Sequence, residues 1–323
     1  MHRIITLAKK EYLDSLKNKI FLVLLGFLLI LTIISIAVAS FDFQNKVVEY
    51  NKSIRILQDL GKSTDVITAP QFYPLKMLRG VMDYLEIIGA IIGIILGYLS
   101  IAKEKGKNTL QLLLSRPLGK VDIAAGKILG NSLLVILVLS IIWAVIYFIM
   151  WFVGGAQLSP TEIIKLSLVF LSSFFYIMFF FAFSSVLALK FKSLPNALII
   201  SFVIWLCFVL IIPQIGDAMD PDNQIPGGFF KSMNIAKPQA TEIMKKFHTY
   251  EIIRNRVEES SITKHYERLD FALLGVKDEY NLKGVGYILY DRRSDIIWVL
   301  SFFSLMMFSE FFVLRKSNFI IKK

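Results

Sequence analysis

The chain has 323 residues, of which 55% are hydrophobic and 19% are charged, and its formal net charge is +11. Soluble domains average about 25% charged residues, and the apolar residues here come in long blocks. The composition therefore excludes an ordinary soluble domain and indicates a polytopic membrane protein. The single cysteine, Cys207, excludes an intrachain disulfide.

Residues 1–19 predict an amphipathic helix that lies in the membrane interface ahead of the first apolar block. Apolar side chains fall on one side of a 3.6-residue wheel and basic side chains on the other. Such a helix can serve as a topology anchor, or as an elbow that also contacts a cytoplasmic partner. The apolar positions that define this elbow helix are Ile4, Ile5, Ala8 and Tyr12.

Six apolar blocks follow that are candidates to cross a hydrocarbon layer of about 30 Å as helices, of which the fifth is short. Backbone polar groups in lipid must bond internally, so uninterrupted spans are helices. The predicted fold class is an all-α polytopic membrane protein. The expected spans are residues 20–41, 84–102, 128–153, 163–189, 197–213 and 296–314. The expected connections are an extracytoplasmic loop at 42–83, a cytoplasmic segment at 103–127, an extracytoplasmic segment at 214–295 and a cytoplasmic tail at 315–323.

The distribution of charge predicts the orientation. One side of this arrangement holds residues 1–19, 103–127, 190–195 and 315–323, with seventeen Lys and Arg against four Asp and Glu. The long segment 214–294 on the other side holds twelve of each. The positive-inside rule then puts both termini in the cytoplasm and the chain in the cytoplasmic membrane. Anionic lipid headgroups account for the positive charge without a nucleic-acid partner.

The segment between the second and third spans is basic, amphipathic and too polar to enter lipid. It fits the loose pattern E-[KR]-x-x-G-T-L-x-L-L-L-S-x-P-[LV]-x-R, followed by G-K-x-x-G. Asn108 stands where the pattern has glycine, and Lys120 where it has arginine. The matching residues are Glu104, Thr109, Leu110, Leu112, Leu113, Leu114, Ser115, Pro117, Leu118, Gly126, Lys127 and Gly130.

This pattern resembles the permease subunits of ABC-2-type ABC transporters, of the kind represented by NosY and the Na⁺-efflux permeases. Residues Ile4–Tyr12 are similar to the N-terminal helix of that family. The order of elbow helix, span, loop, span, motif and four further spans extends the resemblance over the whole chain.

The resemblance implies an exporter subunit in which residues 103–120 form a coupling helix seated in a groove of a separate ATP-binding subunit. ATP and Mg²⁺ would bind that partner, and this chain would carry no cofactor and no catalytic site of its own. Without the resemblance, the same segment reads as a re-entry loop whose charges face water. The residues expected to contact the ATP-binding subunit are Glu104, Lys107, Thr109, Leu110, Leu113, Leu114, Ser115 and Pro117.

The resemblance also implies a second permease protomer, and we favour a homodimer over a heterodimer with a sister permease. Gly89, Gly93 and Gly97 form a G-x-x-x-G-x-x-x-G stripe in the second span that lets another helix approach closely. That helix belongs either to the same chain or to the seam between protomers. Glu310 is the acidic residue deep in a span, and it is either a functional carboxylate or a partner of Arg315.

The extracytoplasmic segments suggest a small domain that either caps the outer face or docks substrate or an accessory protein. Residues 239–270 predict helix, and 285–290 either a short strand or the lead into the last span. The sequence Ser159-Pro-Thr-Glu162 predicts a helix start by its capping pattern.

The sequence shows no motif for nucleotide or metal binding. Gly61-Lys62-Ser63 imitates the end of a phosphate-binding loop, but Ile56 stands where the first glycine is needed. The histidines lack metal-ligand spacing, so we expect no metal site. An intramembrane enzyme needs polar groups at matched depths in two spans, and a secondary transporter usually shows broken or repeated helices. Both stay open as alternatives, and the substrate is not readable.

Overall fold

The computed structural model of the chain is helical and describes residues 2–60, 73–106, 119–219, 229–236, 239–240, 242–243, 246, 248–281 and 283–316. Most of the predicted coupling segment falls outside the described residues. The expected contact residues that lie outside are Lys107, Thr109, Leu110, Leu113, Leu114, Ser115 and Pro117.

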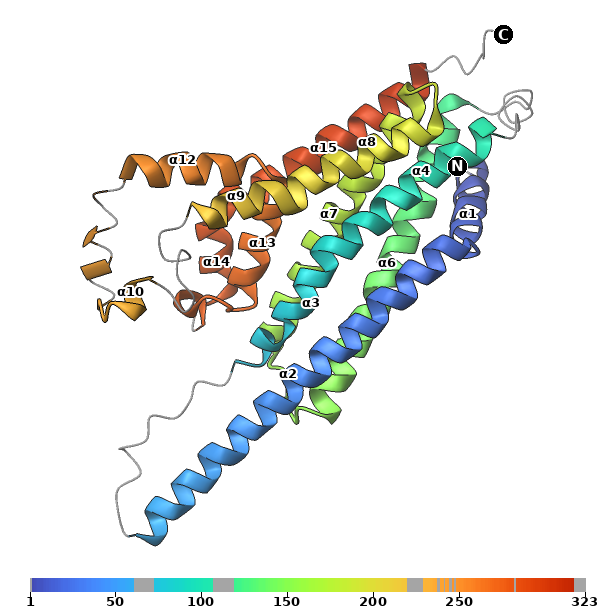
Figure 1. Cartoon of the computed structure of the whole chain (residues 1–323). Coiled ribbons are helices and arrows are strands. Elements are labelled where there is room, and N and C mark those ends of the chain that lie inside the picture. The colour runs from blue at the N-terminus through green and yellow to red at the C-terminus, as the bar shows by residue number, and fades with distance from the viewer. Residues whose placement is uncertain are drawn as a thin grey trace.

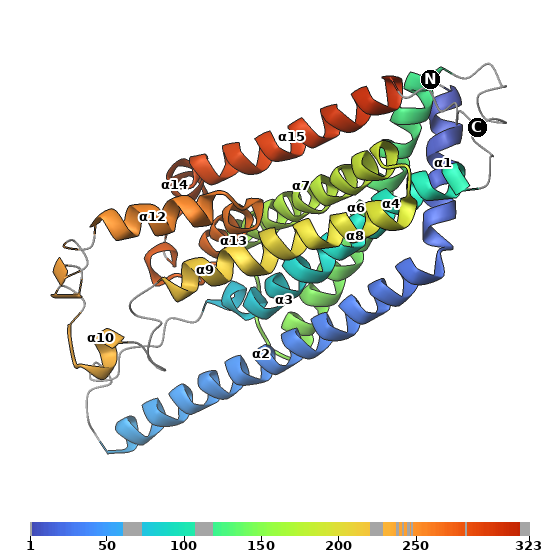
Figure 2. The same cartoon turned by 45° about the horizontal axis from the view of Figure 1, so that its top comes forward.

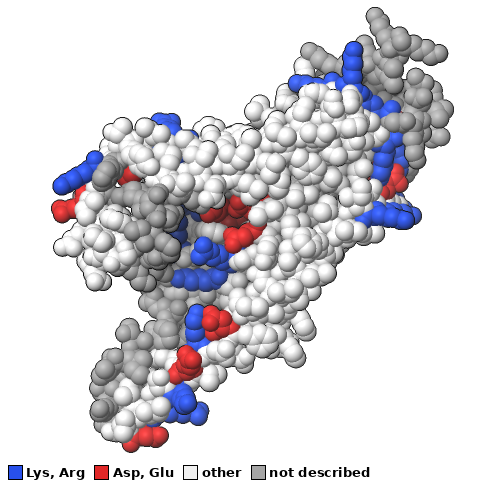
Figure 3. Space-filling view, in the orientation of Figure 1, with Lys and Arg blue, Asp and Glu red and all other residues white. Residues whose placement is uncertain are grey.

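The prediction of six long apolar helices is confirmed for the described residues. These helices run side by side in one bundle (Figures 1 and 2). In the face seen in Figure 3, charged side chains gather at the two ends of the molecule and in a hollow, and the broad surface between them is almost free of charge. The helical stretches are Lys19–Asp59, Pro74–Lys105, Val121–Phe152, Pro160–Lys190, Leu194–Gly216 and Arg293–Leu314.

The first long helix, α2 (Lys19–Asp59), continues well past residue 41, so the first part of the segment 42–83 is helical instead of a loop. Forty-one residues span about 60 Å at 1.5 Å per residue, which is about twice the hydrocarbon thickness. The sequence from Asp42 to Leu60 is polar but contains no glycine or proline. A change to polar residues ends an apolar span, but it does not end a helix in the absence of helix-breaking residues such as glycine or proline.

The second and fifth stretches are each built from several pieces. The second consists of η2 (Pro74–Leu78), α3 (Arg79–Tyr84), the π-helical turn η3 (Leu85–Gly89) and α4 (Ala90–Gly106). The fifth consists of α8 (Leu194–Leu206), the π-helical turn η4 (Cys207–Ile211) and α9 (Ile212–Ala218). Each π turn inserts a wider turn into an otherwise regular helix.

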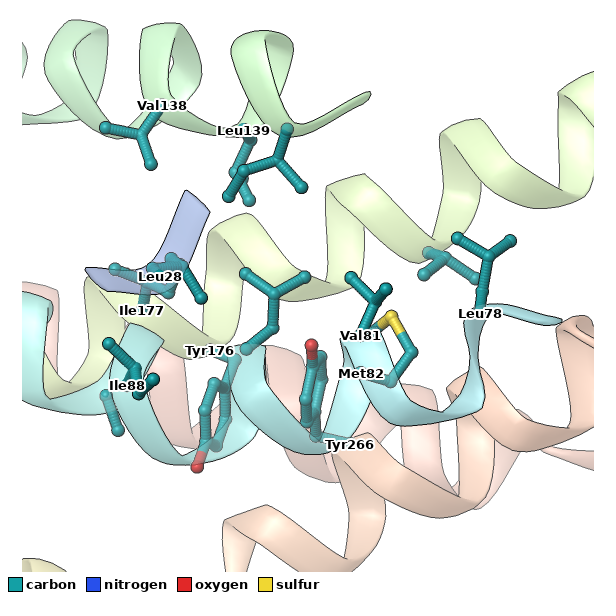
Figure 4. Packing of buried hydrophobic residues seen from close by; sticks show 14 of the residues in the cluster. Leu28, Leu78, Val81, Met82, Ile88, Val138, Leu139, Tyr176, Ile177 and Tyr266 are labelled. Carbon is teal, nitrogen blue, oxygen red and sulfur yellow. The ribbon is translucent and has the colours of Figure 1, made fainter. Parts of the chain in front are cut away.

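The core is organised around α7 (Pro160–Lys190), which contacts α4, α6 (Lys120–Phe152), α8 and α15 (Arg293–Lys316). The predicted capping box begins α7: the Glu162 carboxylate accepts from Ser159 N–H at 2.7 Å. Figure 4 shows Tyr176 and Ile177 of α7 packed among Leu28 of α2, Val138 of α6 and Tyr266. From Ser172 to Leu189 no residue of α7 is exposed, so this half of the helix contacts neighbours on all sides.

The segment after α9 contains α10 (Phe229–Ser232), α12 (His248–Glu259), α13 (Ile262–Leu273), η6 (Asp278–Tyr280) and α14 (Val285–Asp291). The expected helix at 239–270 is divided at Ser261, whose hydroxyl caps α13 by accepting from Thr263 N–H. The strand considered for residues 285–290 is wrong, because α14 is helical and leads into α15.

Candidate functional site

The N-terminal helix α1 (His2–Leu16) packs along the first half of α6. Two glycines of α6 face it. A Cβ at Gly126 would lie 2.5 Å from the Leu7 Cβ, and a Cβ at Gly130 would lie 2.5 Å from the Ala8 carbonyl oxygen. Any larger side chain would push the two helices apart. The two glycines of the G-K-x-x-G pattern are therefore the surface against which α1 lies.

The lysine between these glycines is the centre of a buried ionic cluster. The Lys127 side chain is 2% exposed, and its Nζ lies 3.2 Å from a Glu11 carboxylate oxygen and 2.9 Å from a Glu104 carboxylate oxygen. The same ammonium donates to the Ser100 carbonyl at 2.5 Å. Because Glu11 is on α1, Glu104 on α4 and Lys127 on α6, one side chain joins three helices. We call Lys127, Glu11 and Glu104 the junction.

A second polar contact reinforces the α1–α6 packing. The Ser15 hydroxyl donates to the Asn131 side-chain carbonyl at 3.0 Å, and Asn131 in turn donates to the Lys127 carbonyl at 2.9 Å. All three residues are buried. Buried polar groups that are fully bonded hold a single arrangement, because any shift leaves one of them without a partner.

The last turn of α4 carries two further lysines that bond helix ends. Lys103 Nζ donates to the Asp14 carbonyl of α1 at 3.1 Å. Lys105 Nζ donates to the Phe191 carbonyl at 2.6 Å and to the Ala188 carbonyl at 3.0 Å, at the end of α7. Cations at helix C-termini satisfy free carbonyls and favour the helix dipole. Lys103 and Lys105, shortly before segment 107–118, thus connect α4 to the ends of α1 and α7.

The sequence-predicted residues of this region are brought together in part. Ala8 is buried, and Ile4 and Tyr12 are half-buried, whereas Ile5 is exposed. The Glu104 carboxylate points into the junction, where it is 10% exposed, and not to the surface. Sequence reasoning missed the roles of Glu11 and Lys127. The available signal was Glu11 at the edge of the apolar side of the α1 wheel, next to Ile4.

The glycine stripe of the second span packs within the chain. A Cβ at Gly89 would lie 3.3 Å from the Ile177 side chain of α7, and a Cβ at Gly93 would lie 2.5 Å from the Ile177 carbonyl oxygen. A Cβ at Gly97 would collide with the Phe181 carbonyl of α7. The space beside Gly93 and Gly97 of α4 is therefore filled by α7 of the same chain, which packs α4 and α7 closely together.

A polar seam joins α7 to α13 at the other end of the bundle. Ser172 donates to the Asp270 carboxylate, the Ser173 hydroxyl lies 2.8 Å from the Tyr266 hydroxyl, and the Tyr176 hydroxyl lies 3.2 Å from the Thr263 hydroxyl. The Tyr176 and Tyr266 rings stack with centroids 4.3 Å apart. We call these six residues the seam.

Burial sets the protonation states in the seam. Burial raises the pKa of the Asp270 carboxyl well above its usual value, and the hydrogen bonds from Ser172 and Tyr266 offset this only in part. Burial likewise raises the pKa of the Tyr266 phenol. Desolvation disfavours the charged form of both groups. Burial therefore favours the neutral form of both groups.

Glu310 lies fully buried in α15 and accepts a hydrogen bond from the Ser185 hydroxyl of α7 at 2.7 Å. Its second carboxylate oxygen has no partner among the described residues. The Arg315 side chain, which the sequence offers as a partner, lies outside what the structure describes. Within the described residues, no group of three His, Cys, Asp or Glu side chains is placed to hold a metal ion.

The comparisons with known proteins identify the family. The model of the ABC-2 family transporter proteins matches residues 5–279, which include most of α1, the junction, the glycine stripe and the seam. A search of curated proteins finds no match. The six apolar helices and the family together show a multi-pass membrane protein that is a transmembrane subunit of a transporter, a class that is generally not itself catalytic. The chain therefore belongs to the ABC-2 transporter family.

Proposed function

We propose that this chain is the permease subunit of an ABC-2-type exporter and that a separate ATP-binding subunit, which would bind ATP and Mg²⁺, drives it through residues 103–120. In this proposal both termini and the junction face the cytoplasm, and two permease protomers, most simply two identical copies, work together. The α12–α14 region would then face the outside, where it could receive an accessory protein.

The junction is the observation that carries the proposal. Segment 107–118 is bounded by the last turn of α4 and the start of α6, and the Glu104–Lys127 ion pair joins these two boundaries directly. Glu11 adds α1 to the same cluster. A displacement of the segment would therefore move three helices together, and α4 would transmit it to α7 through the glycine stripe.

This geometry also changes the role proposed for one residue. The Glu104 carboxylate is engaged inside the chain, so we propose that it positions the segment, whereas the contact with the ATP-binding subunit is made by Leu110, Leu113 and Leu114. Apolar side chains at helical spacing suit a groove in a partner protein.

Copurification tests the proposal. The chain is coexpressed with an ATP-binding protein from the same source that carries the G-x-x-x-x-G-K-[ST] motif, and the variant Leu110→Asp is compared with Leu60→Asp. Leu60 is an exposed leucine at the far end of α2, so the chemical change is matched. We expect Leu110→Asp alone to reduce recovery of the ATP-binding protein and the ATPase activity of the complex. Equal recovery and equal ATPase activity for both variants would refute the coupling role.

A further inference from the structure

An apolar cavity of about 120 Å³ lies between α7, α13, α14 and α15. Figure 2 shows α14 at the start of α15, beside α13. The walls of the cavity include Leu168 and Phe175 of α7, Leu289 of α14 and Ile296 of α15. Its one polar lining residue is Ser172. The Ser172 hydroxyl is already bonded to Asp270 and to the Val169 carbonyl. The cavity therefore offers nothing to a polar ligand and suits a hydrocarbon chain.

Three basic residues lie on the helices that line this cavity or just before them. Lys165 precedes Leu168 by three residues on α7, and Arg293 precedes Ile296 by three residues on α15, so each cation shares a helix face with a lining residue. Both lie toward the N-terminal ends of helices that run in the same direction. Lys165 Nζ donates to the Lys283 carbonyl at 3.0 Å, which brings Lys283, two residues before α14, close to Lys165. We call Lys165, Lys283 and Arg293 the rim.

The rim charges are not neutralised by the described residues, because none of the three cations has an ion pair there. The nearby acids are engaged elsewhere. Glu162 attracts Lys165, but its carboxylate bonds the Ser159 N–H and hydroxyl. Asp291 and Asp295 pair with Arg292. Unpaired cations beside an apolar cavity favour an anionic ligand with an apolar body.

Exposed tyrosines mark the depth of the rim. The Lys283 ammonium lies 4.8 Å from the Tyr287 ring centroid, and the Arg293 guanidinium lies 4.3 Å from the Tyr290 ring centroid. These rings are 51% and 70% exposed. Tyrosine, lysine and arginine together are typical of the level of lipid headgroups, and the cavity lies one helical turn deeper.

We propose that this cavity, whose volume of about 120 Å³ suits a group of roughly benzene size, holds a short segment of one acyl chain of an anionic phospholipid whose phosphate is bound by the rim. The apolar wall selects the chain, and the charge of the rim selects the headgroup. This site is separate from the junction and does not depend on the proposed coupling to an ATP-binding subunit.

The test measures lipid retention by the whole purified chain in native mass spectrometry, with phosphatidylglycerol and phosphatidylcholine of identical acyl chains. The rim variant Lys165→Gln/Lys283→Gln/Arg293→Gln is compared with a control, Lys46→Gln/Lys52→Gln/Arg55→Gln. The control removes two lysines and one arginine from the part of α2 beyond the expected span. We expect the amount of phosphatidylglycerol bound to the rim variant to be lower than that bound to wild type by a factor of at least about five. The control should bind the wild-type amount.

A third variant separates the chain site from a headgroup site. Val299→Phe replaces a valine of the cavity wall with a larger aromatic side chain that would fill the cavity. This variant should also release phosphatidylglycerol. Retention of both lipids in equal amounts by wild type, or loss in the rim variant but not in Val299→Phe, would overturn the proposal. Wild-type chain exposed to phosphatidylglycerol with a photoreactive group in its acyl chain should be labelled within residues 168–175, 269–273 or 289–300. Labelling confined to other helices would overturn it without any variant.

Discussion

The junction and the seam both bury polar groups in an apolar bundle, but they do so with opposite chemistry. The junction holds one ammonium between two carboxylates, whereas the seam consists of hydroxyls and one carboxyl whose charged form is disfavoured by burial. Removing one member of a buried ion pair costs about 3–5 kcal/mol, because it leaves a charge unpaired. Losing one neutral hydrogen bond costs about 1 kcal/mol. The junction should therefore fail as a unit, while the seam should weaken in steps.

The sharpest test of this contrast removes the shared cation. Lys127→Met leaves Glu11 and Glu104 buried without a counter-charge, and we expect a loss of about 3–5 kcal/mol in the free energy of unfolding. The triple variant with Glu11→Gln and Glu104→Gln removes the unpaired charges and should recover much of that loss. Denaturant unfolding in micelles measures both. A loss of less than about 1 kcal/mol for the single variant would show that the junction is not a charge cluster.

The next test calibrates the polar contacts against a purely steric one. Gly97→Ala places a methyl group against the Phe181 carbonyl, and we expect a loss of about 1–3 kcal/mol from overpacking. Gly26→Ala is the matched control, because a Cβ there meets nothing within 4 Å and alanine favours helix by up to about 1 kcal/mol. The same unfolding measurement should give opposite signs for the two variants. Equal signs would mean that α4 and α7 can separate freely.

The seam predicts smaller losses than the junction. Ser173→Ala and Tyr266→Phe each remove one side of the same hydroxyl pair, and each should cost about 1 kcal/mol. The double variant should cost less than the sum, because the second change no longer strands a partner. A loss near that of Lys127→Met for either single change would erase the distinction between seam and junction.

The smallest expected effect concerns pH. Because burial raises the pKa of Asp270 in the folded chain, its contribution to stability is full below about pH 4, where the unfolded carboxyl is also protonated. That contribution is lost as the pH rises through the folded-state pKa. Asp270→Asn has no such proton, so its unfolding midpoint should fall less than that of wild type between pH 4 and pH 9. Parallel pH profiles would show that Asp270 is not the neutral group of the seam.

Local features of the sequence predicted the fold. The lengths of the apolar runs predict six helices, and all six are present among the described residues. The capping pattern at Ser159 predicts the start of α7, and the bonds are formed. The boundary at residue 41 does not coincide with the end of α2, which continues to Asp59, because the sequence change there is one of polarity and not of helix propensity.

The candidate site was predicted only in part. The elbow residues and the motif after α4 direct attention to this end of the chain. The pairing of Lys127 with Glu11 and Glu104 was not predicted, because Lys127 and Glu11 are 116 residues apart along the chain. A basic residue beside an apolar block is most simply read as a boundary of the membrane. Only the approach of α1 across Gly126 and Gly130 turns that lysine into the centre of a buried cluster.

The sequence by itself determined that the chain is a bundle of six apolar helices with an amphipathic N-terminal helix, because hydrophobic length and helix caps depend on neighbouring residues. The tertiary structure decided which partners the buried polar groups take. It placed Lys127 between two carboxylates, set Asp270 against hydroxyls and filled the glycine stripe with α7. The physical reason is that a charge in an apolar interior is tolerated only with a partner, and that partner is chosen by packing between helices far apart in the chain.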